Sequence, residues 1–158
     1  MAAADRQQNT YFRGEVGEEK VDFSQNFKTD GTTVKTITHF FYEDGNDVET
    51  ATLERLSTST STNLADLALR EQKTFRVSGG VIGNDTTGIG TLQTYSLFAG
   101  TLNEEKQDLQ KTYAANGTTV RNTQVFYYGA ANGTTNTSTT RASAASSTQS
   151  LVRSEQFK

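Results

Sequence analysis

The chain of 158 residues contains no cysteine, no proline and no tryptophan, and it has a single methionine. Without cysteine it can form no disulfide, no thiolate metal site and no thiol nucleophile. Hydrophobic residues make up only 33% of the sequence, and no apolar run approaches the roughly 20 residues of a membrane-spanning helix. The first residues lack the basic and apolar regions of a secretory signal. We therefore expect no membrane partner and no Sec-type export.

Small polar residues take the place of the missing hydrophobic ones. The 27 threonines, 12 serines, 10 asparagines and 10 glutamines together exceed a third of the chain. Such a sequence cannot build a thick core, so we expect a lone subunit to be only marginally stable. The formal net charge of −3 disfavours a dedicated nucleic-acid binder. The composition therefore favours other proteins as partners, and a second copy of the chain first of all.

The sequence repeats itself without gaps at an offset of 86 residues. Residues 10–62 and residues 96–148 share 17 identities in 53 positions, and most of these are neither threonine nor serine. Apolar residues keep their register, as Phe40 and Phe126 show. Chance similarity between two threonine-rich stretches does not produce this pattern, so we infer a duplication.

The duplication divides the chain into three parts. A first β repeat with an N-terminal arm takes residues 1–72, and a glycine-rich connecting hairpin or loop takes residues 73–95. A second β repeat with a low-complexity C-terminal arm takes residues 96–158. The ends of the copies also match, since residues 70–72 resemble residues 154–156 after a shift of about two residues.

Both copies predict strands at the same positions. Thr, Val, Phe and Tyr alternate at a period of two over residues 34–42 and 120–128, which is typical of a strand. Asp30-Gly31 and Asn116-Gly117 stand before these strands and favour type I′ hairpin turns. Further strands are expected over residues 11–16, 21–29, 47–56, 97–102 and 107–115. The sequence thus predicts an all-β fold of two tandem β-meander repeats, sandwich- or barrel-like, with an extended C-terminal arm and at most one short helix, at residues 63–69.

The C-terminal arm contains a stretch, residues 134–150, that has no large apolar side chain. A free segment of this composition is disordered. It becomes ordered where another surface satisfies its backbone hydrogen bonds, and we expect that surface to belong to a neighbouring copy.

Residues that could carry chemistry are few. His39 is the only histidine, the second copy has Val125 in its place, and we expect it to be a half-exposed strand residue. The acidic residues 43–49 offer oxygen ligands for Ca²⁺, but the second copy has no carboxylate there. The glycine-rich residues 79–90 lack the lysine of a phosphate-binding loop, and we interpret them as a flexible crossing or a protruding hairpin tip. We therefore expect no catalytic residue, no metal site and no cofactor.

Aromatic residues on both faces of the long strands indicate that both faces are covered, in so lean a chain by another subunit. Residues 1–75 carry five more acidic than basic groups and residues 76–158 two more basic than acidic ones, which favours head-to-tail contact. Stacking of the aromatics on a sugar or a single-stranded nucleic acid is the alternative. The predicted interface residues are Phe40, Phe41, Tyr42, Phe126, Tyr127, Tyr128, Thr137, Ser143 and Phe157.

These features predict a non-enzymatic structural protein that assembles with itself, as a trimer or a ring, on a repeating protein lattice such as a capsid or a tail. The general character of the chain fits a virion component of a tailed bacteriophage, either a capsid decoration (cement) protein or a tail or neck ring protein. One alternative is an extracellular filament or matrix subunit that assembles by strand addition. The other is a ligand- or carbohydrate-binding β module.

Overall fold

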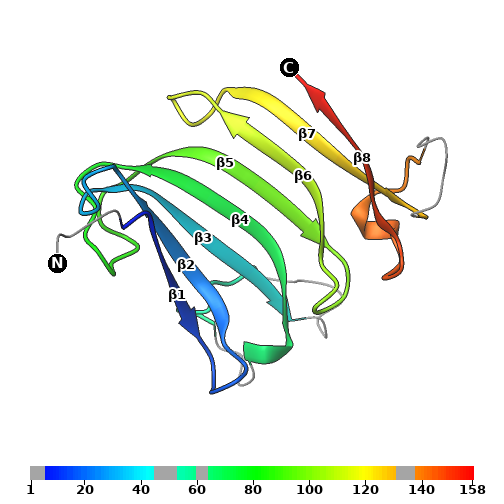
Figure 1. Cartoon of the computed structure of the whole chain (residues 1–158), viewed down its shortest axis with the longest axis horizontal. Coiled ribbons are helices and arrows are strands. Elements are labelled where there is room, and N and C mark those ends of the chain that lie inside the picture. Colours follow the sequence, from blue (N-terminus) through cyan, green and yellow to red (C-terminus); the bar gives the residue numbers. More distant parts are fainter. Residues whose placement is uncertain (1–5, 45–52, 60–63, 131–137) are drawn as a thin grey trace.

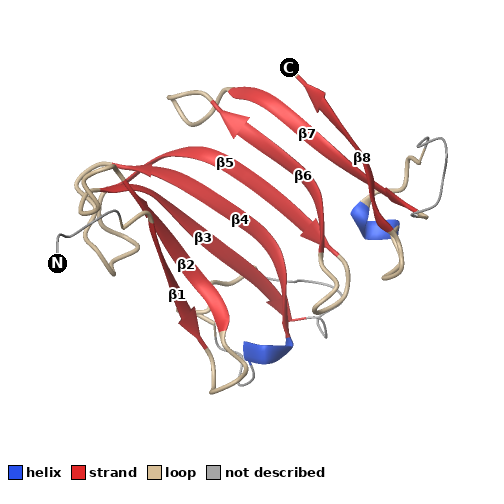
Figure 2. Cartoon of the chain, viewed as in Figure 1, coloured by secondary structure: helices blue, strands red, loops and turns tan. Residues whose placement is uncertain are grey.

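The computed structural model is one open antiparallel β-sheet of eight strands, in which the order of the strands follows the order of the sequence (Figures 1 and 2). The structure describes residues 6–44, 53–59, 64–130 and 138–158. The predicted all-β meander is confirmed, but the sheet neither closes into a barrel nor forms a sandwich. The strands are β1 (Gln8–Arg13), β2 (Lys20–Phe27), β3 (Val34–Asp44), β4 (Leu67–Val77), β5 (Ile89–Ala99), β6 (Lys106–Tyr113), β7 (Val120–Gly129) and β8 (Ser150–Phe157).

The helix predicted over residues 63–69 is wrong in its described part. Residues Leu64–Asp66 form a single 3-10 turn, η1, and β4 begins directly after it. β4 pairs with β3 over nearly its whole length, from Asp44 opposite Leu67 to Thr36 opposite Arg76. This ladder of backbone hydrogen bonds outweighs the helical spacing of the leucines, because local propensity is a weak preference that tertiary pairing overrides.

The predicted hairpin turns lie where expected, but they are longer than the two residues of a type I′ turn. In the first, the N–H of Lys28 donates to the carbonyl of Thr33 at 2.9 Å. Gly31 has a φ of 63°, whereas Asp30 is not among the residues with positive φ. Hydrogen bonds from the Thr33 hydroxyl and from the N–H groups of Thr33 and Thr32 lower the pKa of Asp30 to about 2. Asp30 therefore stabilises the turn as an acceptor.

Several contacts in the first half of the sheet recur in the second half at an offset of 86 residues. The hydroxyl of Tyr42 donates to the carbonyl of Val21 at 2.7 Å, and that of Tyr128 donates to the carbonyl of Gln107 at 2.6 Å. β6 also has the bounds of β2 moved by that offset. Recurrence of both strand bounds and contacts supports the inferred duplication.

The C-terminal arm does not lie apart from the chain, which corrects the prediction for its last residues. β8 pairs with β7 of the same chain, with Phe126 opposite Ser154 and Tyr127 opposite Arg153. Before it, residues 138–149 form a bridge from Thr140 to Tyr128 and the 3-10 turn η2 (Ala142–Ala144). The arm therefore completes its own sheet, although Ser150–Phe157 has few apolar side chains.

The connection between the two halves is shorter than the predicted residues 73–95. β4 extends to Val77 and β5 begins at Ile89, which leaves residues 78–88 as the connecting loop. This loop does not protrude freely. It folds back so that the side chain of Gln25 contacts its backbone, and thus it covers part of the sheet.

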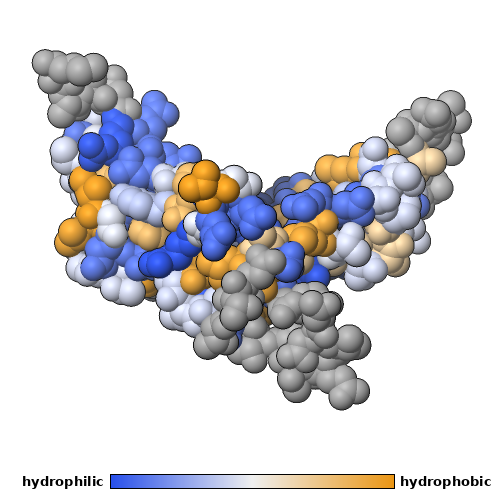
Figure 3. Space-filling model, turned by 90° about the horizontal axis from the view of Figure 1, so that it is seen from below, coloured by the Kyte–Doolittle hydropathy of each residue, from blue (hydrophilic) through white to orange (hydrophobic). Residues whose placement is uncertain are grey.

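The hydrophobic core lies in the first half of the sheet. Phe23, Phe27, Val34 and Ile37 form one buried cluster, and Tyr42, Leu56 and Leu67 form a second. At the matching position of the second half, Val120 is 43% exposed whereas Val34 is 1% exposed. Figure 3 shows hydrophobic side chains on one side of the molecule as separate patches among polar ones. The two halves thus share a backbone plan but differ in how well they are covered.

Candidate functional site

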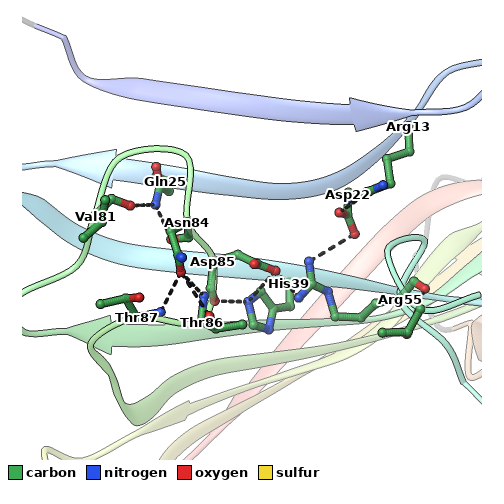
Figure 4. A network of polar contacts seen from close by, with 11 residues as sticks. Arg13, Asp22, Gln25, His39, Arg55, Val81, Asn84, Asp85, Thr86 and Thr87 are labelled. Atoms are coloured by element: carbon green, nitrogen blue, oxygen red, sulfur yellow. Dashed lines mark hydrogen bonds and ion pairs between the residues drawn. The ribbon is translucent and has the colours of Figure 1, made fainter.

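A network of polar side chains joins three separate parts of the chain over the first half of the sheet (Figure 4). It connects β2 and β3 with the segment 53–59 and with the connecting loop 78–88. We call it the first-half polar network. Its side chains are those of Arg13, Asp22, Gln25, His39, Arg55 and Asp85, and the side chain of Asn84 accepts hydrogen bonds from Thr86 and Thr87 within the loop.

Asp22 is the buried anion of this network. Its carboxylate accepts from Nε of Arg13 and from Nη2 of Arg55, each at 3.0 Å. Arg55 also forms an ion pair with Asp85 of the connecting loop. One guanidinium therefore links a strand to the loop, and this compensates for the burial of the carboxylate.

The second half contains only part of this arrangement. Asp108 and Arg141 stand 86 residues after Asp22 and Arg55, and Nε of Arg141 donates to Asp108 at 2.8 Å. This bond raises the pKa of Arg141. Among the described residues, no second carboxylate forms an ion pair with Arg141 in the way that Asp85 does with Arg55. Asp22 matches Asp108 and Arg55 matches Arg141 when the two copies are aligned, so a comparison of the copies could have predicted this ion pair.

Gln25 holds the connecting loop through its fully buried amide. Its Nε2 donates to the carbonyls of Val81 and Asn84, both at 2.9 Å, and its Oε1 accepts the N–H of Gly83 at 3.0 Å. A buried amide with this many partners fixes the backbone that surrounds it. The second copy has Lys111 at this position, so this contact belongs to the first half alone.

His39 is buried, not half-exposed as the sequence predicted. Its Nε2 lies 3.0 Å from the carbonyl oxygen of Asp85, and its ring packs against the rings of Phe41 and Phe75. Burial, and then the charge of Arg55, lower the pKa of the imidazole. The neutral ring therefore serves as a donor to the loop backbone.

No group of three or more His, Cys, Asp and Glu side chains within the described residues could hold a metal ion. Of the acidic stretch 43–49 that offered calcium ligands, residues 45–49, which include Asp47 and Glu49, lie outside the described residues. The hydrogen bonds of Gln25 and His39 and the ion pair of Arg55 with Asp85 hold the connecting loop against the sheet, and this is the role that the geometry of the first-half polar network supports.

The predicted interface residues divide into interior and accessible ones. Tyr42 and Tyr128 are buried, and both hydroxyls donate to backbone carbonyls of their own chain, so these two belong to the interior. Burial raises the pKa of both phenols, helped at Tyr42 by Asp22. Phe157 is 51% exposed. The half-buried residues are Phe40, Phe41, Phe126 and Tyr127, Ser143 is exposed, and Thr137 lies outside the described residues.

The two edge strands of the sheet carry large hydrophobic side chains on the surface. Phe12 of β1 is 58% exposed, and Leu151 of β8 is exposed as well. The topology gives β1 one neighbour, β2, and gives β8 one neighbour, β7. Sequence reasoning did not select Phe12 or Leu151. The match of Phe12 with Phe98 was visible, but nothing local tells an edge strand from an inner one.

Small hydroxyl side chains form one row across the sheet, which we call the hydroxyl row. Opposite residues in successive strands give Thr10, Ser24, Thr38, Thr74, Thr94 and Thr112, and the row ends at Asn122. Two of its members, Thr38 and Thr74, are hydrogen-bonded to each other at 2.8 Å. A pocket of about 620 Å³ lies against part of the row and is also lined by the basic side chains of Arg6, Lys28 and Lys35.

Within the described part of the chain, no helix is long and apolar enough to cross a membrane. Comparison with protein-family models, with curated proteins and with solved structures gives no significant match in any of the three.

Proposed function

We propose that this chain is a non-enzymatic structural subunit that works by assembling with copies of itself, as a virion component of a tailed bacteriophage. The observation that carries this proposal is that β1 and β8 are the two edge strands of a single open sheet, each paired with one neighbouring strand among the described residues. An edge strand presents a row of unpaired N–H and C=O groups and is a template for pairing with another chain. Soluble monomers usually cover, shorten or bend such edges.

Uneven packing of the two halves supports the same proposal. The first half has two buried clusters, a polar network and a loop folded over it. In the second half the buried hydrophobic residues are Val125, Tyr128 and Ala142, among the described residues. A half-sheet with so little burial gains stability when a neighbour removes more of its apolar surface from water.

The placement in a virion depends on the general character of the sequence. A β-rich chain without cysteine or proline, built from two similar halves, suits repeated contacts on a lattice. A trimer of such chains presents six similar units to a six-fold partner.

A ligand-binding module is the second candidate, because the 620 Å³ pocket beside the hydroxyl row has a basic rim. Pockets of this size bind small molecules through a few converging polar groups. The lining contains one aromatic residue, Phe27, which is little for stacking on a sugar. This function would require a monomer that binds an oligosaccharide or an anion at this pocket.

Sedimentation velocity over a wide range of concentration tests the proposed function. A subunit that assembles gives species at multiples of 17.2 kDa, and their share rises with concentration. A single 17.2 kDa species at every concentration, including high salt that favours apolar contacts, would contradict it and favour the ligand-binding module.

A further inference from the structure

We propose that copies of the chain join head to tail, with β8 of one subunit adding antiparallel to β1 of the next in the register that β4 and β5 use within the chain. This inference rests on the proposed function and names the surfaces that would carry it. The partner is therefore a second copy of this chain, bound through its sheet edge.

The chain contains one junction of this kind already. β4 is the last strand of the first half and β5 is the first strand of the second half, and they pair antiparallel. Gln72 lies opposite Ser96, and Lys73 lies opposite Tyr95. β8 is the last strand of the second half and β1 is the first strand of the first half, so β8 and β1 are the two strands that lack this junction.

The internal junction fixes the register of the proposed contact. Thr10 stands 86 residues before Ser96, the offset of the repeat. Ser154 corresponds to Gln72, because Phe126 pairs with Ser154 as Phe40 pairs with Gln72. The last strands thus match at an offset of 82 residues rather than after the shift of about two that the sequence suggested. The register therefore places Ser154 opposite Thr10.

The backbone of β1 has groups free to accept a strand in this register. The N–H of Phe27 in β2 donates to the carbonyl of Gln7 at 2.9 Å, so the backbone of residue 7 faces β2. Backbone groups alternate in direction along an antiparallel strand. Asn9 therefore also faces β2, and the N–H and C=O of Thr10 point to the free edge.

The side chains that meet in this register are compatible. Glu155 lies opposite Asn9 and Arg153 opposite Tyr11, so no two like charges face each other across these positions. Phe157 corresponds to Phe75, because Phe157 pairs with residue 123 and Phe75 pairs with residue 37, which is 86 positions earlier. β5 lies beside Phe75, whereas Phe157 is 51% exposed. Because Phe75 lies opposite Leu92, the same register places Phe157 opposite Arg6, just before β1 of the next subunit, and strand addition would cover part of this exposed side chain.

When β8 of one subunit pairs with β1 of the next, the first subunit of the row still has an unpaired β1 and the last one an unpaired β8. This contact gives a closed ring if the rotation from one subunit to the next closes, and an open filament otherwise. Both products have the same local pairing, and this pairing is what the experiment must detect.

Disulfide trapping tests the register, because the chain has no cysteine of its own. We expect Thr10→Cys and Ser154→Cys, made as two single variants and mixed under mild oxidation, to form a covalent dimer that contains one of each. An opposed antiparallel pair has its Cα atoms about 5.5 Å apart, within the range that a disulfide spans. The double variant should form a ladder of covalent multimers on a denaturing gel.

The matched control is Thr10→Cys mixed with Glu155→Cys. A slip of one residue moves the side chain to the other face of the sheet, so the yield of this dimer should be at least about tenfold lower. An equal yield contradicts the register. A double variant that bridges only within its own chain also overturns the inference, because β1 and β8 would then close one subunit.

Failure of the inference and failure of the proposed function give different results. Multimers in sedimentation without the Thr10–Ser154 dimer mean that the chain assembles through another surface. A single species at 17.2 kDa without any dimer means that both proposals are wrong. As a second measurement, Thr10→Pro removes an edge N–H that has no partner among the described residues. It should raise the concentration for half-assembly roughly tenfold or more while the circular dichroism spectrum is unchanged.

Discussion

Replacement of Asp22 by asparagine should cost more stability than the same replacement at Asp108, although both residues form an ion pair with an arginine 33 positions later. The side chain of Asp22 is 2% exposed and that of its partner Arg55 is 12% exposed. At the second pair, Arg141 is 37% exposed. Water can therefore replace the lost carboxylate at Arg141 but hardly at Arg55.

The expected magnitude follows from this difference in burial. Removal of one partner from a buried ion pair costs about 3–5 kcal/mol. Asp85 still pairs with Arg55 after the change, and the bond from Arg13 is half exposed and contributes little, so we expect about 3 kcal/mol for Asp22→Asn. For Asp108→Asn we expect about 1 kcal/mol, because its partner is much more accessible.

Urea denaturation followed by circular dichroism measures both losses, with comparison of midpoints at an unchanged slope. In thermal unfolding, about 3 kcal/mol corresponds to a decrease in Tm of roughly 6–12 °C for a chain of this size. A loss at Asp108→Asn equal to or greater than that at Asp22→Asn would refute the reasoning that burial of the arginine sets the cost.

Three further predictions concern the first half of the sheet. Ile37→Ala should lower the free energy of unfolding by about 3–4 kcal/mol, because Ile37 is fully buried. Thr123→Ala at the matching position should change the free energy of unfolding by about 0.5 kcal/mol or less. Equal urea midpoints for the two variants would contradict this prediction. Gln25→Ala should speed protease cleavage within residues 78–88, because three hydrogen bonds to that loop are lost, and Lys111→Ala should leave the cleavage rate unchanged. Because the pKa of His39 is lowered in the folded chain, the unfolded chain binds this proton more tightly. The free energy of unfolding should therefore fall as the pH drops below about 6.5, by at most about 1.4 kcal/mol per pH unit. A His39→Gln variant that shows the same fall between about pH 7 and about pH 5.5 would show that another group is responsible.

The positions of β2, β3, β6 and β7 could be predicted because both copies gave the same pattern there, whereas β4 and most of β5 lie where a short helix and a connecting loop were expected. Alternation at residues 34–42 and 120–128 agrees with β3 and β7, and the two hairpin turns lie between the expected strands. At these positions the side-chain periodicity of the first copy indicated strands, and periodicity is the main local signal of secondary structure.

The features that could not be predicted depend on contacts between distant residues. β8 has weak local preference for a strand, and pairing with β7 makes it one. Gln25 looks like an ordinary polar strand residue, and its partners in the connecting loop are 56 to 59 residues away. His39 was expected to be half-exposed because nothing in its neighbourhood shows that the same loop covers it. The predicted assembly partners stay predictions, and the trapping experiment addresses them.

The order of the strands has a consequence for how the chain folds. Every ladder joins two strands that follow each other in sequence, so contacts are more local than in a sheet with crossed connections, and loop closure costs less entropy at each step. We expect folding to begin in the hairpin of β2 and β3, where Phe27 and Ile37 are buried together. The sheet can then grow outward by one strand at a time, and the sparsely buried β6–β8 would order last and open first.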